Sequence, residues 1–268
     1  MSARCPEIDR RAARRRFARA AATYAQAARL EDEVAARMLE RLDYVKLAPQ
    51  RVLDAGSGPP RRALRKRYPA ARVIALDFSL AMLRRGRARF FQSGPWLVCG
   101  ELERLPFADG AVQLVWSNMA LHWLGEPLAA FKEFRRVLAP EGLLMFSTLG
   151  PDSLKELRAA AGAARVHGFI DMHDLGDMLL AAGLSNPVMD MEMLTLRYGD
   201  AERLLGDLRA SGQTSARADR PRGLAGRAFG ESLRRRLGDS TVATFEVVYG
   251  HAWKAAEVKT VRVFKSIP

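Results

Sequence analysis

Hydrophobic residues recur at helical spacing through the first part of the chain. Between Asp9 and Leu47 they fall three or four positions apart, which is typical of the apolar face of amphipathic helices, and Pro49 ends the pattern. The segment 1–48 is therefore predicted to be a helical N-terminal cap.

From Arg51 onward, short apolar runs alternate with helical patterns. Such alternation predicts a parallel β-sheet with helices on both faces. The strand-like runs are 51–56, 72–77, 96–100, 112–118 and 142–149, and the helices are expected at 61–67, 80–90 and 127–138.

The second half of the chain changes character. Two strand-like runs, 187–198 and 241–253, suit strands that close the sheet antiparallel. Helices are expected at 153–164, 174–182 (ended by Gly183) and 201–211, with a Gly-, Ser- and Arg-rich loop at 211–230 and a short basic helix after it. The pattern predicts one domain: a seven-stranded, mostly parallel α/β sheet over 49–268, with a helical insertion at about 200–240.

Composition limits the class of protein. At 268 residues and 49% hydrophobic content the chain can bury a full core, and no apolar run of about 18 residues predicts a membrane span. Cys5 and Cys99 lie far apart, and the four histidines form no metal-ligand spacing. We expect a cytoplasmic monomer without a metal site.

The chain is strongly basic, with a net charge of +13. Such a field attracts acidic proteins, nucleic acid or anionic membranes. The arginines are dispersed and no RNA-binding or zinc-finger pattern accompanies them, so we expect neither nucleic acid nor membrane as a partner. An arginine-rich proteome remains an alternative explanation of the charge.

A glycine loop follows the first predicted strand. Asp54 and Ala55 lead into Gly56-Ser57-Gly58, and the next strand ends in Asp77, where a carboxylate can accept both ribose hydroxyls. Because ligands of doubly wound sheets bind at the carboxyl ends of the strands, these residues predict a nucleotide-type cofactor site.

The region 51–148 resembles the class I S-adenosylmethionine-dependent methyltransferases. It has the glycine loop, the acid Asp77 and a second acid, Glu101, followed by Leu-Pro-Phe after the third strand. Segments along most of the chain, among them FARAAATYAQAARLEDEVAARMLERL, ALHWL, FIDMHDLGDMLLAAGL and FEVVYGHAW, resemble the malonyl-acyl-carrier-protein O-methyltransferases of biotin synthesis (the BioC family). The resemblance implies a Rossmann-like fold and methyl transfer from S-adenosylmethionine to a malonyl carboxyl group.

The resemblance also implies site residues. Cofactor-binding residues would be Asp54, Gly56, Ser57, Gly58, Asp77, Phe78, Glu101, Leu102 and Ser117. Candidates around the acceptor are Tyr24, His122, Trp123 and Arg158. A core aromatic (Tyr24), a packed aromatic corner (His122 and Trp123) and a solvated helix face (Arg158) are the structural alternatives.

Some positions depart from the family pattern. Pro60 stands in place of a third glycine, and we expect Pro59-Pro60 to start the next helix, since proline suits a first helical turn. Ser57 replaces a common cysteine, and Gln113 a usual aspartate. A proline ring beside the cofactor's methionine end would weaken binding.

Three other functions stay open at this stage. One is a fold of this type that binds another nucleotide, and one is a diverged binding or assembly module without chemistry. The third is a methyltransferase-like complex I assembly factor that hydroxylates an arginine, for which the sequence offers no evident iron-ligand triad.

An acidic acyl-carrier protein is the expected partner, since basic residues near the entrance would steer it. The candidate docking residues are Arg217, Arg220, Arg222, Arg227 and Arg234 to Arg236, with Arg14 to Arg16 as a second cluster. A solvated charged face is the structural alternative.

Overall fold

The computed structural model of the protein describes residues 7–85, 94–223, 226–238 and 241–256. In chain order the elements are α1 (Arg10–Ala20), α2 (Tyr24–Ala27), α3 (Arg29–Arg41), η1 (Leu42–Tyr44), β1 (Arg51–Ala55), α4 (Ala63–Arg67), β2 (Arg72–Asp77), α5 (Leu80–Arg85), β3 (Trp96–Cys99), β4 (Val112–Ser117), η2 (Leu121–Trp123), α6 (Pro127–Val137), β5 (Leu138–Leu149), α7 (Lys155–Ala161), η3 (Ala163–Arg165), α8 (Met172–Ala181), β6 (Ser185–Tyr198), α9 (Ala201–Ala210), α10 (Arg227–Leu237) and β7 (Thr241–Trp253).

The seven strands form one sheet in the order β3-β2-β1-β4-β5-β7-β6. Strands β1 to β5 pair in parallel, and β7 lies antiparallel between β5 and β6. The predicted seven-stranded, mostly parallel sheet is confirmed, as is the helical insertion (α9 and α10) before the last strand. Both late strands close the sheet through antiparallel pairing, as expected: β7 pairs with β5, and β6 pairs with β7. Strand β6 itself therefore has the same direction as β5.

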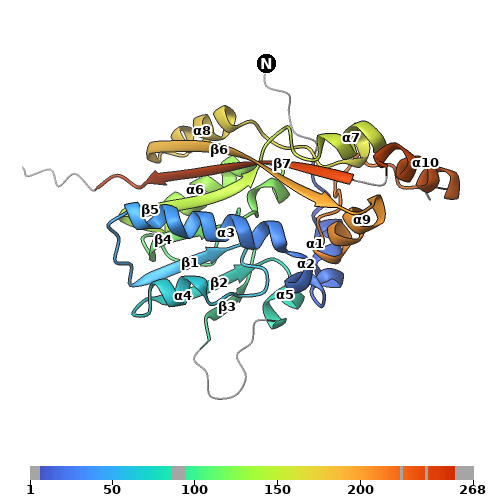
Figure 1. Cartoon of the computed structure of the whole chain (residues 1–268). Coiled ribbons are helices and arrows are strands. Elements are labelled where there is room, and N and C mark those ends of the chain that lie inside the picture. Colours follow the sequence, from blue (N-terminus) through green and yellow to red (C-terminus); the bar gives the residue numbers. More distant parts are fainter. Residues whose placement is uncertain (1–6, 86–93, 224–225, 239–240, 257–268) are drawn as a thin grey trace, which may run out of the picture.

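Helices cover both faces of the sheet (Figure 1). On one face α3, α4, α7, α9 and α10 contribute buried side chains to the core, and on the other α6 and α8 do so. Val34, Met38 and Leu42 are fully buried in that first core. The last helix of the predicted cap therefore packs against the sheet itself.

Several element boundaries follow from local chemistry. Pro127 begins α6 at a position where its missing N–H costs nothing. Gly183, at φ +81°, follows α8 in the left-handed conformation that commonly ends helices. Of the helix expected at 80–90, Leu80–Arg85 is helical, and 86–90 lie outside the described residues.

The insertion loop is attached to the start of the chain. The Asp9 amide donates to the Ala216 carbonyl at 2.8 Å, and the Ala218 amide donates to the Glu7 carbonyl at 2.8 Å. Helix α1 with Phe17 forms a third, smaller core with Met82, Trp123 and Ala216. The cap and the insertion thus meet above the carboxyl ends of the parallel strands.

Candidate functional site

The glycine loop after β1 requires its glycines. Gly56 and Gly58 have φ values of +77° and +58°, which side chains disfavour. The Gly56 amide donates to the Leu76 carbonyl at 2.8 Å, so the loop turns tightly beside the end of β2. A Cβ at Gly56 would overlap the Cβ of Ala120, whereas a Cβ at Gly58 would meet Tyr24 at an ordinary 3.8 Å.

The prolines after the loop do not start the helix. Helix α4 begins at Ala63, with Arg62 as its N-cap, so the expected start at Pro59-Pro60 was wrong. In the stretch before α4, Arg61 lies beside Asp32 of α3, and the two side chains form an ion pair. Neither proline is among the residues that line the two pockets described below.

Two aspartates lie behind the glycine loop. The carboxylate of Asp77 accepts hydrogen bonds from the amides of Gly58 (2.9 Å) and Ser79 (2.7 Å). Burial raises the pKa of Asp77 to about 6, although the two hydrogen bonds favour the charged form and act in the opposite direction. Burial, with the negative charge of Asp77, raises the pKa of Asp54 to about 7.

A small pocket of about 60 Å³ adjoins these residues. It brings together Gly56, Gly58, Asp77, Phe78, Glu101 and Leu102 of the predicted cofactor set. Asp54, Ser57 and Ser117 do not line it; Ser117 is fully buried and donates to the Ala55 carbonyl at 2.9 Å.

Helix α1 closes one side of this pocket. Arg10, Ala13 and Phe17 line it, and Arg14 forms an ion pair with Glu101. Because ligand pockets usually enclose about 300 Å³ or more, the small pocket has to widen to admit a nucleotide-type cofactor. The residues present fit such a cofactor: a tight glycine turn, a hydrogen-bond-accepting carboxylate at the end of β2 and a second acid after β3.

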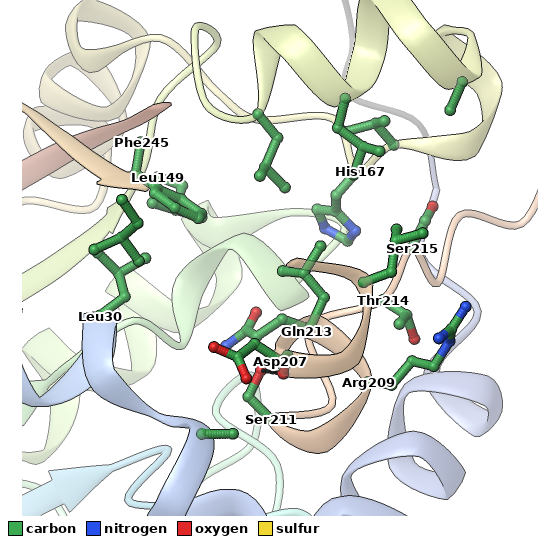
Figure 2. A pocket seen from close by; sticks show the side chains of 18 of the residues that line it. Leu30, Leu149, His167, Asp207, Arg209, Ser211, Gln213, Thr214, Ser215 and Phe245 are labelled. Atoms are coloured by element: carbon green, nitrogen blue, oxygen red, sulfur yellow. Dashed lines mark hydrogen bonds between the residues drawn. The ribbon is translucent and has the colours of Figure 1, made fainter. Parts of the chain in front are cut away.

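A larger cavity of about 240 Å³ lies beside the small pocket (Figure 2). Met119, Trp123 and Gln213 line both spaces, so these three residues mark their junction. Most of the exposed lining is apolar, with side chains such as Leu30, Leu149 and Phe245. An acyl group could extend along such a wall and present its end at the junction.

The predicted acceptor residues fall in different places. Trp123 lines both spaces, His122 lines the larger cavity and Tyr24 lines the small pocket. The pKa of Tyr24 is raised mainly by burial, then by the nearby negative charge of Glu31. Arg158 lines neither; its guanidinium donates to the carbonyls of Pro151 (2.6 Å) and Ser153 (3.1 Å).

The polar residues of the larger cavity that sequence reasoning missed include Glu31, His167, Gln213 and Ser215. The Nε2 atom of Gln213 donates to the carboxyl of Glu31 at 2.6 Å. His167 Nε2 lies 2.6 Å from the His122 carbonyl. Isolated polar residues carry no spacing signal, whether in a helix (Glu31) or in loops, and only the fold brings these together.

The histidines of the cavity are uncharged at neutral pH. Burial lowers the pKa of His122 to about 3 and that of His167 to about 4. In the part of the chain that the structure describes, no group of three or more metal-binding side chains is found. Nor is any described helix long and apolar enough to cross a membrane.

Most of the predicted docking arginines have intramolecular partners. Arg220 pairs with Asp9 at 3.0 Å in a largely buried contact. Arg217 pairs with Asp219, Arg227 with Glu231, and Arg234 with Glu202, while Arg236 donates to the Ala160 carbonyl. Arg29, Arg165 and Arg209, which the sequence did not single out, line the larger cavity.

Comparisons with known proteins agree with this geometry. A family model described as a methyltransferase domain matches residues 53–146. The chain is 49% identical to the malonyl-(acyl-carrier protein) O-methyltransferase of Laribacter hongkongensis, over 92% of this chain and 90% of that protein. It is 47% identical to the protein of the same name from Gallionella capsiferriformans, over 93% and 92% of the two chains.

Solved structures share the fold at low identity. The YcgJ protein of Bacillus subtilis superposes with a TM-score of 0.59 and 16% identity, over 82% of this chain and 98% of that one. The [4+2]-cyclase SpnF superposes with a TM-score of 0.51 and 22% identity, over 85% and 81%. A named cyclase among these neighbours illustrates that the fold alone does not define a reaction.

Proposed function

Because this chain belongs to the malonyl-(acyl-carrier protein) O-methyltransferases, a family of S-adenosylmethionine-dependent enzymes, we propose that it methylates the free carboxyl group of malonyl-acyl-carrier protein. The product is the methyl ester that enters biotin synthesis. The observation that carries this proposal beyond family membership is the pair of adjoining pockets, which share Met119, Trp123 and Gln213.

The small pocket would hold S-adenosylmethionine, which supplies an electrophilic methyl group on a sulfonium. The loop at Gly56 and Gly58 would lie against its amino-acid part, Asp77 would accept from the ribose hydroxyls, and Glu101 with Leu102 would lie near the adenine. Phe78 lines the same pocket, and Asp54, Ser57 and Ser117 would support the loop from behind.

The reaction needs positioning more than acid–base chemistry. A malonyl carboxylate is already ionised at pH 7, so no general base has to remove a proton. The bound cofactor would supply its methyl group to one carboxylate oxygen and keep the electron pair of the broken carbon–sulfur bond on sulfur. The apolar cavity walls exclude water, and Tyr24, His122 and Trp123 would orient the two reactants. Arg158 would act indirectly, through the loop that it binds.

The carrier protein would dock beside the larger cavity. Arg29 and Arg209 line this cavity and are exposed, which suits an acidic partner. Within the basic region predicted from the sequence, Arg222 and Arg235 are also exposed. We also propose that the enzyme acts as a monomer in the cytoplasm, as a single domain.

The direct test is an assay with purified components. Incubation with S-adenosylmethionine and malonyl-acyl-carrier protein should add one methyl group to the carrier protein, detected by mass spectrometry. Acetyl-carrier protein, which has no free carboxylate, should stay unmodified. A folded protein that binds S-adenosylhomocysteine but forms no ester would favour a binding or assembly module instead.

A further inference from the structure

At one end of the larger cavity, several buried polar atoms have no hydrogen-bond partner. Among the described residues, the unpartnered buried atoms include His122 Nε2, His167 Nδ1, Trp123 Nε1 and Ser215 Oγ, all on residues that line this cavity. The exposed fractions of the two histidines and the tryptophan are only 7%, 7% and 8%. Buried polar atoms are nearly always hydrogen-bonded, so four unpartnered ones indicate that a polar ligand group completes them.

The three aromatic side chains of this group are held close together. The rings of Trp123 and His167 lie 4.8 Å apart between centroids, and those of His122 and His167 lie 6.1 Å apart. Figure 2 shows the His167 ring pointing into the cavity, on the side where Ser215 lies. Since His167 Nε2 lies 2.6 Å from the His122 carbonyl, Nε2 carries the proton and donates it, which leaves Nδ1 as the free atom.

The charge around this end is positive. Arg217 and Arg16 both lie close enough to His167 to lower its pKa, in addition to burial. Arg16 is held by the Thr214 carbonyl at 2.8 Å, and Arg217 by the Ala163 carbonyl at 3.0 Å, with Asp219 as its ion-pair partner. Arg16, Arg217 and Asp219 together carry a net charge of +1 near the unpartnered polar atoms, which favours an anion with several acceptor sites.

We propose that this polar end binds the carboxylate of the acceptor, and that His167 and Ser215 select acyl groups that end in a carboxylate. The inference rests on the proposed function and names the residues that make the enzyme selective for its acyl substrate. The Trp123 N–H and the Ser215 hydroxyl donate to the carboxylate. His167 is uncharged in the free protein. The negative charge of the bound carboxylate raises its pKa, so Nδ1 takes up a proton from solvent and becomes a third, charged donor, while Nε2 keeps its bond to the His122 carbonyl.

Two serine variants separate binding from packing. The Ser215 hydroxyl has no partner, whereas the Ser211 hydroxyl lines the same cavity but donates to the Asp207 carbonyl at 2.9 Å. Calorimetry with S-adenosylhomocysteine bound, which prevents turnover, would compare malonyl- and acetyl-carrier protein. Ser215→Ala should weaken malonyl-carrier binding about ten-fold and leave acetyl-carrier binding unchanged. Ser211→Ala should keep the wild-type ratio.

Two variants of His167 separate its two nitrogens. His167→Gln keeps a donor for the His122 carbonyl and removes the group at Nδ1, so it should lose malonyl selectivity and keep a wild-type Tm. His167→Asn keeps a polar group near Nδ1 and should retain more of the selectivity.

The inference is overturned if Ser215→Ala binds malonyl-carrier protein as the wild type does, or loses both carrier proteins equally. A wild type that forms no ester on malonyl-carrier protein would overturn the proposed function instead.

Discussion

Gln213 donates a hydrogen bond of 2.6 Å to the carboxyl group of Glu31, which lies 182 positions earlier in the chain. Glu31 belongs to the first turn of α3 and is only 4% exposed. Gln213 belongs to the insertion loop and lines both pockets. The bond therefore joins the N-terminal cap to the insertion at the place where cofactor and acceptor would meet.

Removing this carboxyl group should loosen the junction. Glu31→Ala leaves the Gln213 amide unpartnered, and we expect the free energy of unfolding to fall by about 1–3 kcal/mol. Glu31→Gln can still accept from Gln213 and should cost much less. Urea unfolding of the three proteins measures the difference, and equal losses for both variants would contradict a role for the hydrogen bond.

The stability of the wild type should depend on pH differently from that of Glu31→Gln. Burial raises the pKa of Glu31 in the folded state, so the protonated form is favoured there. Its contribution to stability is present below the ordinary pKa and is lost as pH rises through the folded value. Wild type should lose stability relative to Glu31→Gln as the pH rises above the ordinary pKa of a glutamate, until the raised folded-state pKa has been passed.

Cofactor binding should release a proton near pH 6. Asp77 has a pKa of about 6 in the free protein, raised from 3.8, and ribose hydroxyls would donate to its ionised form. Binding therefore lowers this pKa, and the heat of S-adenosylhomocysteine binding at about pH 6 should depend on the ionisation enthalpy of the buffer. Asp54→Asn should keep the proton release, and Asp77→Asn should abolish it. Buffer-independent heat in the wild type would contradict the assignment of Asp77.

The two loop glycines should tolerate alanine differently. At Gly56 a methyl group meets both a positive φ and the Cβ of Ala120, while at Gly58 it meets only the positive φ. Gly58→Ala should cost about 1 kcal/mol of stability, and Gly56→Ala clearly more, with loss of S-adenosylhomocysteine binding. Thermal unfolding and calorimetry test this order, and equal effects would show that Ala120 yields easily.

Replacing Pro60 by glycine should not tighten cofactor binding. The sequence suggested a crowding proline, but Pro60 lies before the start of α4 and outside the lining of the small pocket. We expect an unchanged Kd for S-adenosylhomocysteine and a loss of about 0.4–1 kcal/mol of stability, because glycine makes the unfolded chain more flexible. A markedly lower Kd would restore the crowding hypothesis.

The sheet and the glycine turn beside Asp77 were predictable because their signals are local. Strand periodicity, the glycine turn and Asp77 at a strand end depend on neighbouring residues only. The start of α4 was missed because proline is suited to a first helical turn but also to the turn before a helix, and α4 begins only at Ala63. The acceptor cavity was hardest, since Glu31, His167 and Ser215 come from three distant segments that meet only through the fold.

Arg220, one of the arginines predicted to dock the carrier protein, has a structural role. The sequence favoured Arg220 for docking, but its side chain is only 17% exposed and holds Asp9. Asp9 also caps α1 by accepting from the Ala12 amide at 2.9 Å. Arg220→Glu should therefore lower Tm by placing two carboxylates together, and any change in activity would follow from that loss of stability.

Arg209→Glu is the matched docking variant. Arg209 is exposed at the end of α9 and lines the larger cavity. We expect a raised KM for malonyl-carrier protein, an unchanged Tm and an unchanged Kd for S-adenosylhomocysteine. The wild-type KM should rise between about 0.05 and 0.5 M salt, because the Debye length is already ~10 Å at 0.1 M, and the variant should respond less. A wild-type KM for Arg209→Glu at low salt would move the docking site away from the mouth of the cavity, and Arg222 with Arg235 would be the next pair to replace.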